Sequence, residues 1–540
     1  MATRSTVQQQ LPVLVVGAGP VGLTMAIELV RRGVAVCCVE RAEAASPLSK
    51  ALLVWPRTLQ VLRGLGGGAA IDAAALPVGS FRYYSSSRLI ADLGFDTRTR
   101  PVILPQPDIE ALLADAFDAV GGKIERGVRM TGLEQDGDSV VAFLRTGDNV
   151  SGEEFSYVVG CDGAGSTVRE ALGLGFEGAT YPMNFMLADV RVEGPIRHDA
   201  VHYYCSPKGV LVLIGLPNGR YRVFTSAPPE LGTDAPTMDL LQSMVDLRGP
   251  GGLRLHDDDW SATFAVHARH AERYRSGRVF LAGDAAHIHS PAGGQGLNTG
   301  VTDAHNLAWK LASAWHGHAG DTLLESYATE RTQVANAVVR QADLQTRAWL
   351  IKKPTSILLR DTAVRAAAAT RLFDRDYIPW LTGLRTAYRA GAIAPGGRRN
   401  PGRAGVRDFT PGALLPDRTV TDAATGAVGP LTEVISDLHH TLLIVGGRTD
   451  PAAPDAALAA SISKAGPDFV RIRALRGDGF LTGDQPLDPL PSGSRLVLVR
   501  PDHHVAAVAM AADPAPVAEY LNRYFLAPIA AHSTEESNHS

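Results

Sequence analysis

The sequence predicts an α/β fold in which strands alternate with helices around a largely parallel sheet. Three segments support this prediction, because in each an apolar strand ends in a glycine-containing turn and continues into a helical pattern. The turns read GAGPVG after Val16, CDGAGS after Gly160 and GDAAHIHSPAGGQG after Ala282. Such strand–turn–helix units place the glycine turns at the carboxyl ends of the strands, where α/β proteins bind ligands.

The first turn fits the pattern G-x-G-x-x-G through Gly17, Gly19 and Gly22. These glycines allow a tight turn and a close approach of the backbone to a pyrophosphate. The following helix ends at Gly33, and the next strand ends in Glu40, where a carboxylate can bind ribose hydroxyls. Taken alone, the pattern fits any dinucleotide-binding Rossmann unit.

The third turn is the most informative part of the chain. Asp284 directly follows a strand, so its carboxylate can accept hydrogen bonds from a polyol. The loop from Pro291 to Asn298 then enters a helix near Leu297, and the backbone N–H groups and dipole of a helix N-terminus favour negative charge. A polyol beside developing negative charge matches the ribityl chain and pyrimidine edge of a reduced flavin.

Together, the three turns resemble those of the FAD-dependent aromatic hydroxylases with a single dinucleotide-binding domain, the group A flavoprotein monooxygenases. The resemblance covers nearly the whole chain and extends to PRTLQVL, LPQPDIEALL, ESYATER and a late LVRPDHHVA. The longer form with the late segment is most similar to bacterial hydroxylases of aromatic polyketides. The resemblance implies non-covalent FAD, NAD(P)H (NADPH favoured) and O2 as co-substrates, and hydroxylation through a C4a-hydroperoxide of the flavin.

The resemblance also implies which residues form the site. Lys50 stands where the family usually has Arg, which keeps the charge but loses the bidentate fork. Pro291 and Gly296 are expected to face the reacting flavin as catalytic loop residues. The full set of expected cofactor-binding residues is Gly17, Gly19, Pro20, Val21, Gly22, Glu40, Arg41, Lys50, Gln106, Met130, Asp162, Asp284, Pro291, Gly296, Leu297 and Asn298.

Candidate residues outside the flavin site are fewer. Tyr203, Phe224 and His267 are candidate substrate contacts, although sheet surface or core is an alternative role for Tyr203 and His267. His287 and His289 have the spacing of two metal ligands on one strand face. No acidic or cysteine residue completes a ligand set, so we expect structural histidines and no metal.

The domain organisation follows from the pattern along the chain. We expect an FAD-binding domain, Rossmann-like and of the GR2 type, from 1–178 and again, with long helices, from 271–395, interrupted by a middle β-sheet substrate domain at 179–270. Within it, Pro217-Asn218-Gly219 predicts a hairpin. A Pro/Gly-rich linker leads to a C-terminal domain at 396–530 and a tail at 531–540. The resemblance implies a thioredoxin-like fold there, without C-x-x-C and therefore without dithiol chemistry.

Composition limits the class of protein. A chain of 540 residues with 45% hydrophobic and 20% charged residues is typical of a globular protein of two to three domains. The net charge of −4 gives no reason to expect nucleic acid or anionic membrane as a partner. Four cysteines without C-x-x-C, and a start without a signal peptide, predict a cytoplasmic, disulfide-free protein. We expect a monomer or homodimer, between which the sequence does not decide.

Two alternatives stay open at this level. The same scaffold performs Baeyer–Villiger oxygen insertion on a ketone, and the motifs do not separate the two reactions. A flavin-fold protein that only binds and shields a polyketide is the second alternative, although the intact Gly-Asp and Gly-Gly-Gln-Gly segments favour flavin use. Flavin halogenases carry W-x-W-x-I-P, which this sequence lacks.

Overall fold

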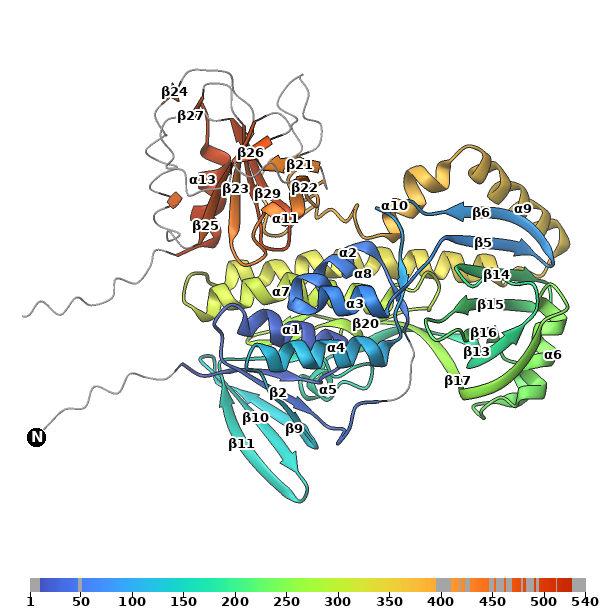
Figure 1. The fold of residues 1–540 in the computed structure, drawn as a ribbon. Coiled ribbons are helices and arrows are strands. Elements are labelled where there is room, and N and C mark those ends of the chain that lie inside the picture. Colours follow the sequence, from blue (N-terminus) through green and yellow to red (C-terminus); the bar gives the residue numbers. More distant parts are fainter. Residues whose placement is uncertain are drawn as a thin grey trace, which may run out of the picture. The chain divides into compact units, whose positions relative to one another are not determined.

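The computed structural model groups the chain into two compact units (Figure 1). The first contains Met1–Val30, Ala35–His305 and Thr332–Arg385, and the second contains Arg31–Val34, Asn306–Arg331 and Thr386–Ser540. Within these ranges the structure describes residues 10–46, 51–394, 409–416, 419–422, 428–445, 451–452, 461–462, 469–476, 479–481, 490–491, 495–510 and 512–526.

A six-stranded sheet forms the centre of the first unit, with the order β18-β19-β12-β1-β2-β8. All neighbours pair in parallel except β18 and β19. Helices α1 (Pro20–Val30) and α4 (Gln106–Ala119) pack together beside it (Figure 1). The α/β prediction is confirmed, and the three predicted strand–turn units are adjacent. The strands are β1 (Val13–Val16), β2 (Val36–Glu40), β8 (Ile124–Arg126), β12 (Tyr157–Gly160), β18 (Arg275–Ser276) and β19 (Val279–Leu281).

Glycine is required where α1 meets β1. Gly17 has φ 101°, a left-handed conformation that side chains rarely adopt. A Cβ on Gly22 would lie 1.8 Å from the carbonyl oxygen of Gly17, so the helix could not approach the strand with any larger residue. The glycines of this motif are therefore required for two reasons: Gly17 for the conformation of the turn, and Gly22 for the close packing of α1 against the turn.

The middle sheet has eight strands in the order β20-β17-β13-β16-β15-β14-β5-β6. Its long strands are β13 (Phe176–Glu193) and β17 (Arg254–Ala271). The predicted hairpin is confirmed, since β15 (Gly209–Gly215) and β16 (Tyr221–Ser226) pair antiparallel across Gly219, which has φ 77°.

The sheet extends beyond the interval 179–270 expected from the sequence. Strands β5 (Ser80–Ser85) and β6 (Arg88–Gly94) come from earlier in the chain, and β20 (His287–Ile288) comes from later. β5 joins by pairing in parallel with β14 (Ala200–Ser206). It belongs there because Phe81 and Tyr83 supply apolar rings to the same face as Tyr203.

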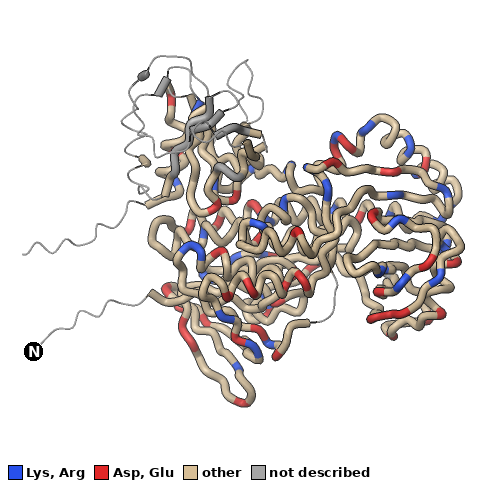
Figure 2. The backbone as a smooth tube through the Cα atoms, viewed as in Figure 1, with Lys and Arg blue, Asp and Glu red and all other residues tan. Residues whose placement is uncertain are grey.

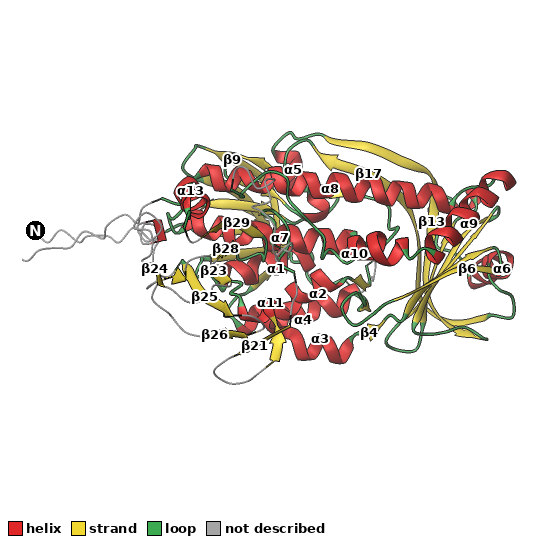
Figure 3. Ribbon diagram, turned by 90° about the horizontal axis from the view of Figure 1, so that it is seen from above, coloured by secondary structure: helices red, strands yellow, loops and turns green. Residues whose placement is uncertain are grey.

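The two faces of this sheet carry separate cores. One packs against α6 (Met238–Arg248), and the other meets α10 (Ile378–Leu381) and α9 (Pro354–Ala369). Figure 3 shows α6 on one side of these strands and α10 on the other. We call the second side the aromatic face, after its ring-bearing residues Phe81, Tyr83, Phe185, Tyr203, Phe224, Trp260 and Phe264.

The second unit is built on a seven-stranded sheet with the order β22-β21-β26-β25-β23-β28-β29. The strands expected from HHTLLIVGG and SRLVLVRPDHHVAAVA are confirmed as β23 (His440–Val445), β28 (Arg495–Val499) and β29 (Val505–Met510). β23 pairs in parallel with β25 (Val470–Arg476) and antiparallel with β28, and helix α13 (Ala515–Tyr524) follows β29. The remaining strands are β21 (Thr419–Asp422), β22 (Val428–Pro430) and β26 (Gly479–Leu481).

The described residues show no segregation of charge along the chain, and the cysteines are free thiols. Lys and Arg are interspersed with Asp and Glu along the described chain (Figure 2). No helix of the described residues is long and apolar enough to cross a membrane. The four cysteines are free thiols: Cys38, Cys161 and Cys205 are buried, and Cys37 is partly buried. Burial raises the pKa of Cys37, Cys38 and Cys205 to about 12.

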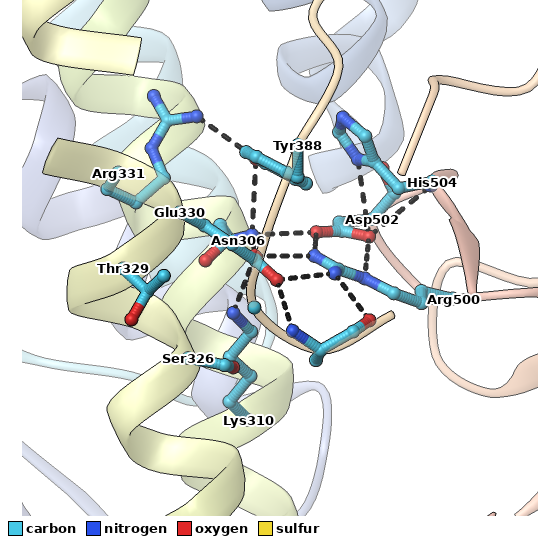
Figure 4. A network of polar contacts seen from close by, with 12 residues as sticks. Asn306, Lys310, Ser326, Thr329, Glu330, Arg331, Tyr388, Arg500, Asp502 and His504 are labelled. Carbon is cyan, nitrogen blue, oxygen red and sulfur yellow. Dashed lines mark hydrogen bonds and ion pairs between the residues drawn. The ribbon is translucent and has the colours of Figure 1, made fainter. Parts of the chain in front are cut away.

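A buried charge network holds the second unit together (Figure 4). Glu330 on α8 (Asp321–Trp349) accepts hydrogen bonds from Lys310 Nζ at 2.7 Å and from Arg500 Nη1 and Nη2 at 2.7 and 2.9 Å. Arg500 Nε donates to Asp502 at 2.9 Å, and all four side chains are almost fully buried. Burial opposes ionisation of Glu330, but the charges of Arg500 and Lys310 prevail and lower its pKa to about 2.

Replacing Glu330 by Gln should lower the free energy of unfolding by about 3–5 kcal/mol, because Arg500 and Lys310 lose the carboxylate that compensates them. The pKa of Glu330 is lowered on folding, so its contribution is present above its unfolded value of 4.5 and is lost as the pH falls towards 2. The free energies of unfolding of the wild type and Glu330→Gln, measured in urea, should therefore become more alike as the pH falls over that range. Glu325→Gln, on the exposed side of α8, is the control. A difference of equal size at pH 7 and pH 3 would contradict this account.

Candidate active site

The candidate site lies at the carboxyl ends of the parallel strands, where the three glycine turns meet. Gly17 N donates to Val39 O at 2.8 Å, and Cys161 N donates to Val16 O at 2.8 Å. Glu40 accepts from Ala18 N and Ala42 N, both at 2.9 Å. A carboxylate has about four acceptor positions, so Glu40 still has capacity for ribose hydroxyls while it holds the first turn.

The first two turns leave space where a pyrophosphate would approach. A Cβ on Gly19 would meet only Glu110 Oε1, at 4.0 Å, and nothing lies within 4 Å of a Cβ on Gly163 or Gly165. Asp162 Oδ1 is buried without a hydrogen-bond partner, and burial raises the pKa of Asp162. An open glycine cradle beside an unsatisfied carboxyl oxygen fits the phosphates and hydroxyls of FAD.

The third turn places Asp284 where the sequence predicted it. Asp284 is exposed, although its neighbours Gly283 and Ala285 are buried. Helix α7 (Gly296–Trp315) begins within one residue of the expected start. A Cβ on Gly296 would meet nothing within 4 Å, so the helix N-terminus is open to a ligand. Gly283 N donates to Asp303 at 3.1 Å, which fixes the turn against α7.

The loop before α7 is held by side chains rather than left mobile. Asn298 Nδ2 donates to Leu53 O at 2.8 Å and to Gly294 O at 2.7 Å, and its Oδ1 accepts from Trp55 N at 2.8 Å. Trp55 Nε1 donates to Gly293 O at 2.9 Å. The amide of Asn298, expected at the cofactor, thus makes these bonds within the protein. Pro291 is exposed, and Leu297 is partly exposed.

The remaining residues expected at the cofactor differ in their exposure and in their hydrogen bonds. Gln106 Nε2 donates to Glu110 Oε1 at 2.8 Å, and Gln106 Oε1 accepts from Ala51 N at 3.3 Å. Met130, on β9 (Val128–Gln135), is buried at 1% exposure, whereas Arg41 is exposed. Lys50 lies outside the described residues.

Pro20 and Val21 serve the packing of α1. Pro20 is its first residue. The Val21 side chain fills the space between Gly283 and Gly300, where an added Cβ would meet it at 2.9 and 2.6 Å.

Two residues outside the expected cofactor-binding set, Arg169 and Glu110, support the site. Arg169 donates to Ala164 O at 2.7 Å and to Ala285 O at 3.0 Å, so it joins the second turn to the third. Burial raises the pKa of Glu110, which pairs with Gln106. The sequence carried the signal for Arg169 in the CDGAGSTVR motif but not its long-range partner.

The two histidines of the third turn differ in their surroundings. His287 Nε2 pairs with Asp303 Oδ2 at 2.7 Å in the core. His289 Nδ1 lies 2.8 Å from Ser290 O, and burial lowers its pKa to about 4, so the ring is neutral at physiological pH.

Comparison with known proteins identifies the family. The FAD-binding domain family matches residues 10–342. A flavin-dependent monooxygenase of Mycobacteroides abscessus is 32% identical over 535 residues, which are 95% of this chain and 100% of the relative. The chain belongs to this family. It is an FAD-dependent monooxygenase.

Two further relatives match most of the chain of this monooxygenase. The 6-methylpretetramide 4-monooxygenase of Streptomyces rimosus is 32% identical over 446 residues, which cover 80% of this chain and 79% of the relative. The solved structure of the flavin-dependent monooxygenase PieE in complex with FAD and substrate has a TM-score of 0.79 and 25% identity, covering 96% of this chain and all of PieE.

The candidate substrate contacts of the monooxygenase are only partly brought together. Tyr203 and Phe224 share the aromatic face, but Tyr203 is 4% exposed, stacks on Tyr83 at 4.7 Å and belongs to the core. His267 lies on the opposite side of β17, because Phe264 and Val266 contribute to the aromatic face and neighbouring residues of a strand alternate. Its Nδ1 lies 2.8 Å from Thr180 Oγ1.

Replacing Asp284 by Ala should weaken FAD retention. A hydrogen bond from a ribityl hydroxyl to this carboxylate is charge-assisted and worth roughly 1.5–3 kcal/mol, or about a 10- to 150-fold rise in Kd. The measurement is FAD content after dialysis and calorimetric titration of the apoprotein. Asp148→Ala, in the exposed turn between β10 (Val140–Thr146) and β11 (Asn149–Phe155), is the control. Equal retention in both variants would remove Asp284 from the cofactor site.

Proposed function

We propose that this monooxygenase hydroxylates a polycyclic aromatic compound of the polyketide type, with NAD(P)H and O2 as co-substrates. The observation that supports this most is the aromatic face. Its rings share one core cluster with Ala292 of the loop expected at the flavin, so an aromatic substrate bound there would lie beside the cofactor. The relative that acts on 6-methylpretetramide supports the same substrate class.

Different residues of the chain are proposed to bind the cofactor, to stabilise charge and to exclude water. Bound FAD would supply the redox chemistry of the reaction. Asp284 would hold the ribityl chain, and the N-terminus of α7 would stabilise negative charge at the edge of the flavin, as an oxyanion hole does. The apolar rings of the aromatic face and Ala292 exclude water from the space where oxygen is transferred.

The nicotinamide cofactor is proposed to dock only transiently. The sequence has one G-x-G-x-x-G fingerprint, at Gly17, and none that would hold a second dinucleotide. NADPH is favoured over NADH. Lys50 stands where the family that the sequence resembles usually has an Arg near the pyrophosphate, and we assign the docking of the nicotinamide cofactor to it.

The C-terminal domain is proposed to have a thioredoxin-like arrangement without redox chemistry. Its central parallel pair β25–β23, the antiparallel strands β28 and β29, and the closing helix α13 support that arrangement. The last cysteine of the chain is Cys205, so no thiol is present there. The domain would then act in assembly or in coupling, whether the protein is a monomer or a homodimer.

A hydroxylated aromatic substrate should accelerate NADPH oxidation by the FAD-loaded protein and should itself gain one oxygen. Mass alone does not distinguish ring hydroxylation from insertion beside a ketone, so the connectivity of the product must be read by NMR. A new phenol supports the proposal, whereas a lactone would assign the Baeyer–Villiger reaction. No acceleration by any hydroxylated two- to four-ring aromatic compound would contradict the substrate class.

Replacing Lys50 by Ala should raise the apparent Michaelis constant for NADPH with little loss of bound FAD, because the cation that attracts the cofactor phosphates is removed. Lys50→Arg restores the family's usual residue and should be neutral or improve that constant. Steady-state kinetics with FAD content measured in parallel tests both. Unchanged kinetics in Lys50→Ala would place the nicotinamide docking site elsewhere.

A further inference from the structure

The aromatic face is arranged in rows because its strands pair in register. Asp189 on β13 stands opposite Arg222 on β16 and Trp260 on β17. The next row along the strands is Phe224, Leu187 and Ala262, and a third contains Phe185 and Phe264. Successive rows are two residues, or about 7 Å, apart. Figure 1 shows these three strands side by side in the sheet.

The first row contains a buried ion pair on an otherwise apolar surface. Arg222 is 1% exposed and Asp189 7%. The guanidinium binds the carboxylate through both Nε and Nη2, the latter at 2.7 Å from Oδ2. Bidentate pairing of this kind is geometrically strict, so the carboxylate has a fixed orientation.

The ion pair holds Trp260 in place. Trp260 Nε1 donates to Asp189 Oδ2 at 2.9 Å, and the Arg222 guanidinium lies 5.0 Å from the centroid of the indole ring. One contact fixes the edge of the ring and the other its face. Neither the flavin site nor the chemistry of oxygen transfer uses these residues, so the network needs another explanation.

Trp260 lies on a part of the aromatic face that is not fully buried. Trp260, Ala262 and Phe264 are partly buried and alternate large, small and large along one side of β17. Among the described residues, β20 pairs with β17 only at Arg269 and His270, so β17 is an edge strand where it carries Trp260, Ala262 and Phe264. β20 leads into the loop expected at the flavin, and Trp260 therefore lies further along β17 from that loop than Phe264 does.

We propose that Trp260 is the stacking surface for the terminal ring of a substrate with three or more fused rings. Asp189 and Arg222 are positioning residues that keep the indole in the stacking orientation. This inference rests on the proposed function and narrows its substrate class. A two-ring compound that binds near Phe264 ends before Trp260, so only longer ring systems gain the contact.

The test compares ring number in the FAD-loaded protein by titration calorimetry. The probes are 1-naphthol, 1,8-dihydroxyanthraquinone and a dihydroxylated naphthacenequinone, with two, three and four rings. Trp260→Leu should raise the Kd of the four-ring probe roughly two- to tenfold, the range expected for one aromatic contact, and leave that of 1-naphthol unchanged. Trp315→Leu removes a partly exposed indole outside the aromatic face and should change none of the three.

A second variant tests the positioning role. Asp189→Asn combined with Arg222→Gln removes both charges together and leaves neither one unpaired. This double variant should raise the Kd of the four-ring probe as much as Trp260→Leu does. A triple variant that combines all three substitutions should show no larger rise in Kd than Trp260→Leu alone. Trp260→Phe keeps a ring but not the N–H donor to Asp189, so its loss should be smaller than that of Trp260→Leu, and this variant tests the contact independently of the ion pair.

The outcomes separate this inference from the proposed function. If Trp260→Leu leaves the four-ring probe unaffected, or weakens 1-naphthol equally, the stacking role is wrong and the proposed function stands. If the binding free energy lost in the triple variant equals the sum of the losses in the double variant and in Trp260→Leu, then Asp189 and Arg222 do not act through Trp260. If none of the three probes binds the FAD-loaded wild-type protein, the proposed function is wrong and the inference with it.

Discussion

The position of the loop before α7 depends on the hydrogen bonds that Trp55 and Asn298 make across it. Trp55 Nε1 binds Gly293 O, its backbone N–H binds Asn298 Oδ1, and its ring lies 5.7 Å from Phe81 on the aromatic face. One side chain thus joins the loop expected at the cofactor to the face expected at the substrate. The spacing between these two surfaces is set by a rigid indole and not by a flexible linker, which suits a reaction that requires accurate placement.

Much of the fold and part of the site could be predicted from the sequence because their signals are local. The glycine turns, Glu40 and Asp284 are each specified by a strand end, a φ value or a helix start within a few residues. The partners of Arg169, Asn298 and Trp55 lie far along the chain and could not be read from it. The middle sheet was underestimated for the same reason, since β5 joins it by parallel pairing with β14.

Buried charge was the hardest feature to infer from the sequence. ESYATER and LVRPDHHVA were visible only as family resemblances, and in the structure Glu330 of one binds Arg500 of the other in the core. Asp189 and Arg222 have no sequence signal, because a lone Asp and a lone Arg on strands are usually surface residues. In each case the charge is tolerated because its partner is supplied by another strand or helix.

The low exposure of the four thiols, three buried and one partly buried, affects how readily the enzyme is oxidised by peroxide. An oxygenase whose reduced flavin reacts without substrate releases hydrogen peroxide, and the peroxide oxidises cysteine through its thiolate. Burial raises the pKa of Cys37, Cys38 and Cys205 to about 12 and also raises that of Cys161, so almost no thiolate exists at neutral pH. These cysteine side chains are therefore poor targets for the peroxide that is released when the reduced flavin reacts without substrate.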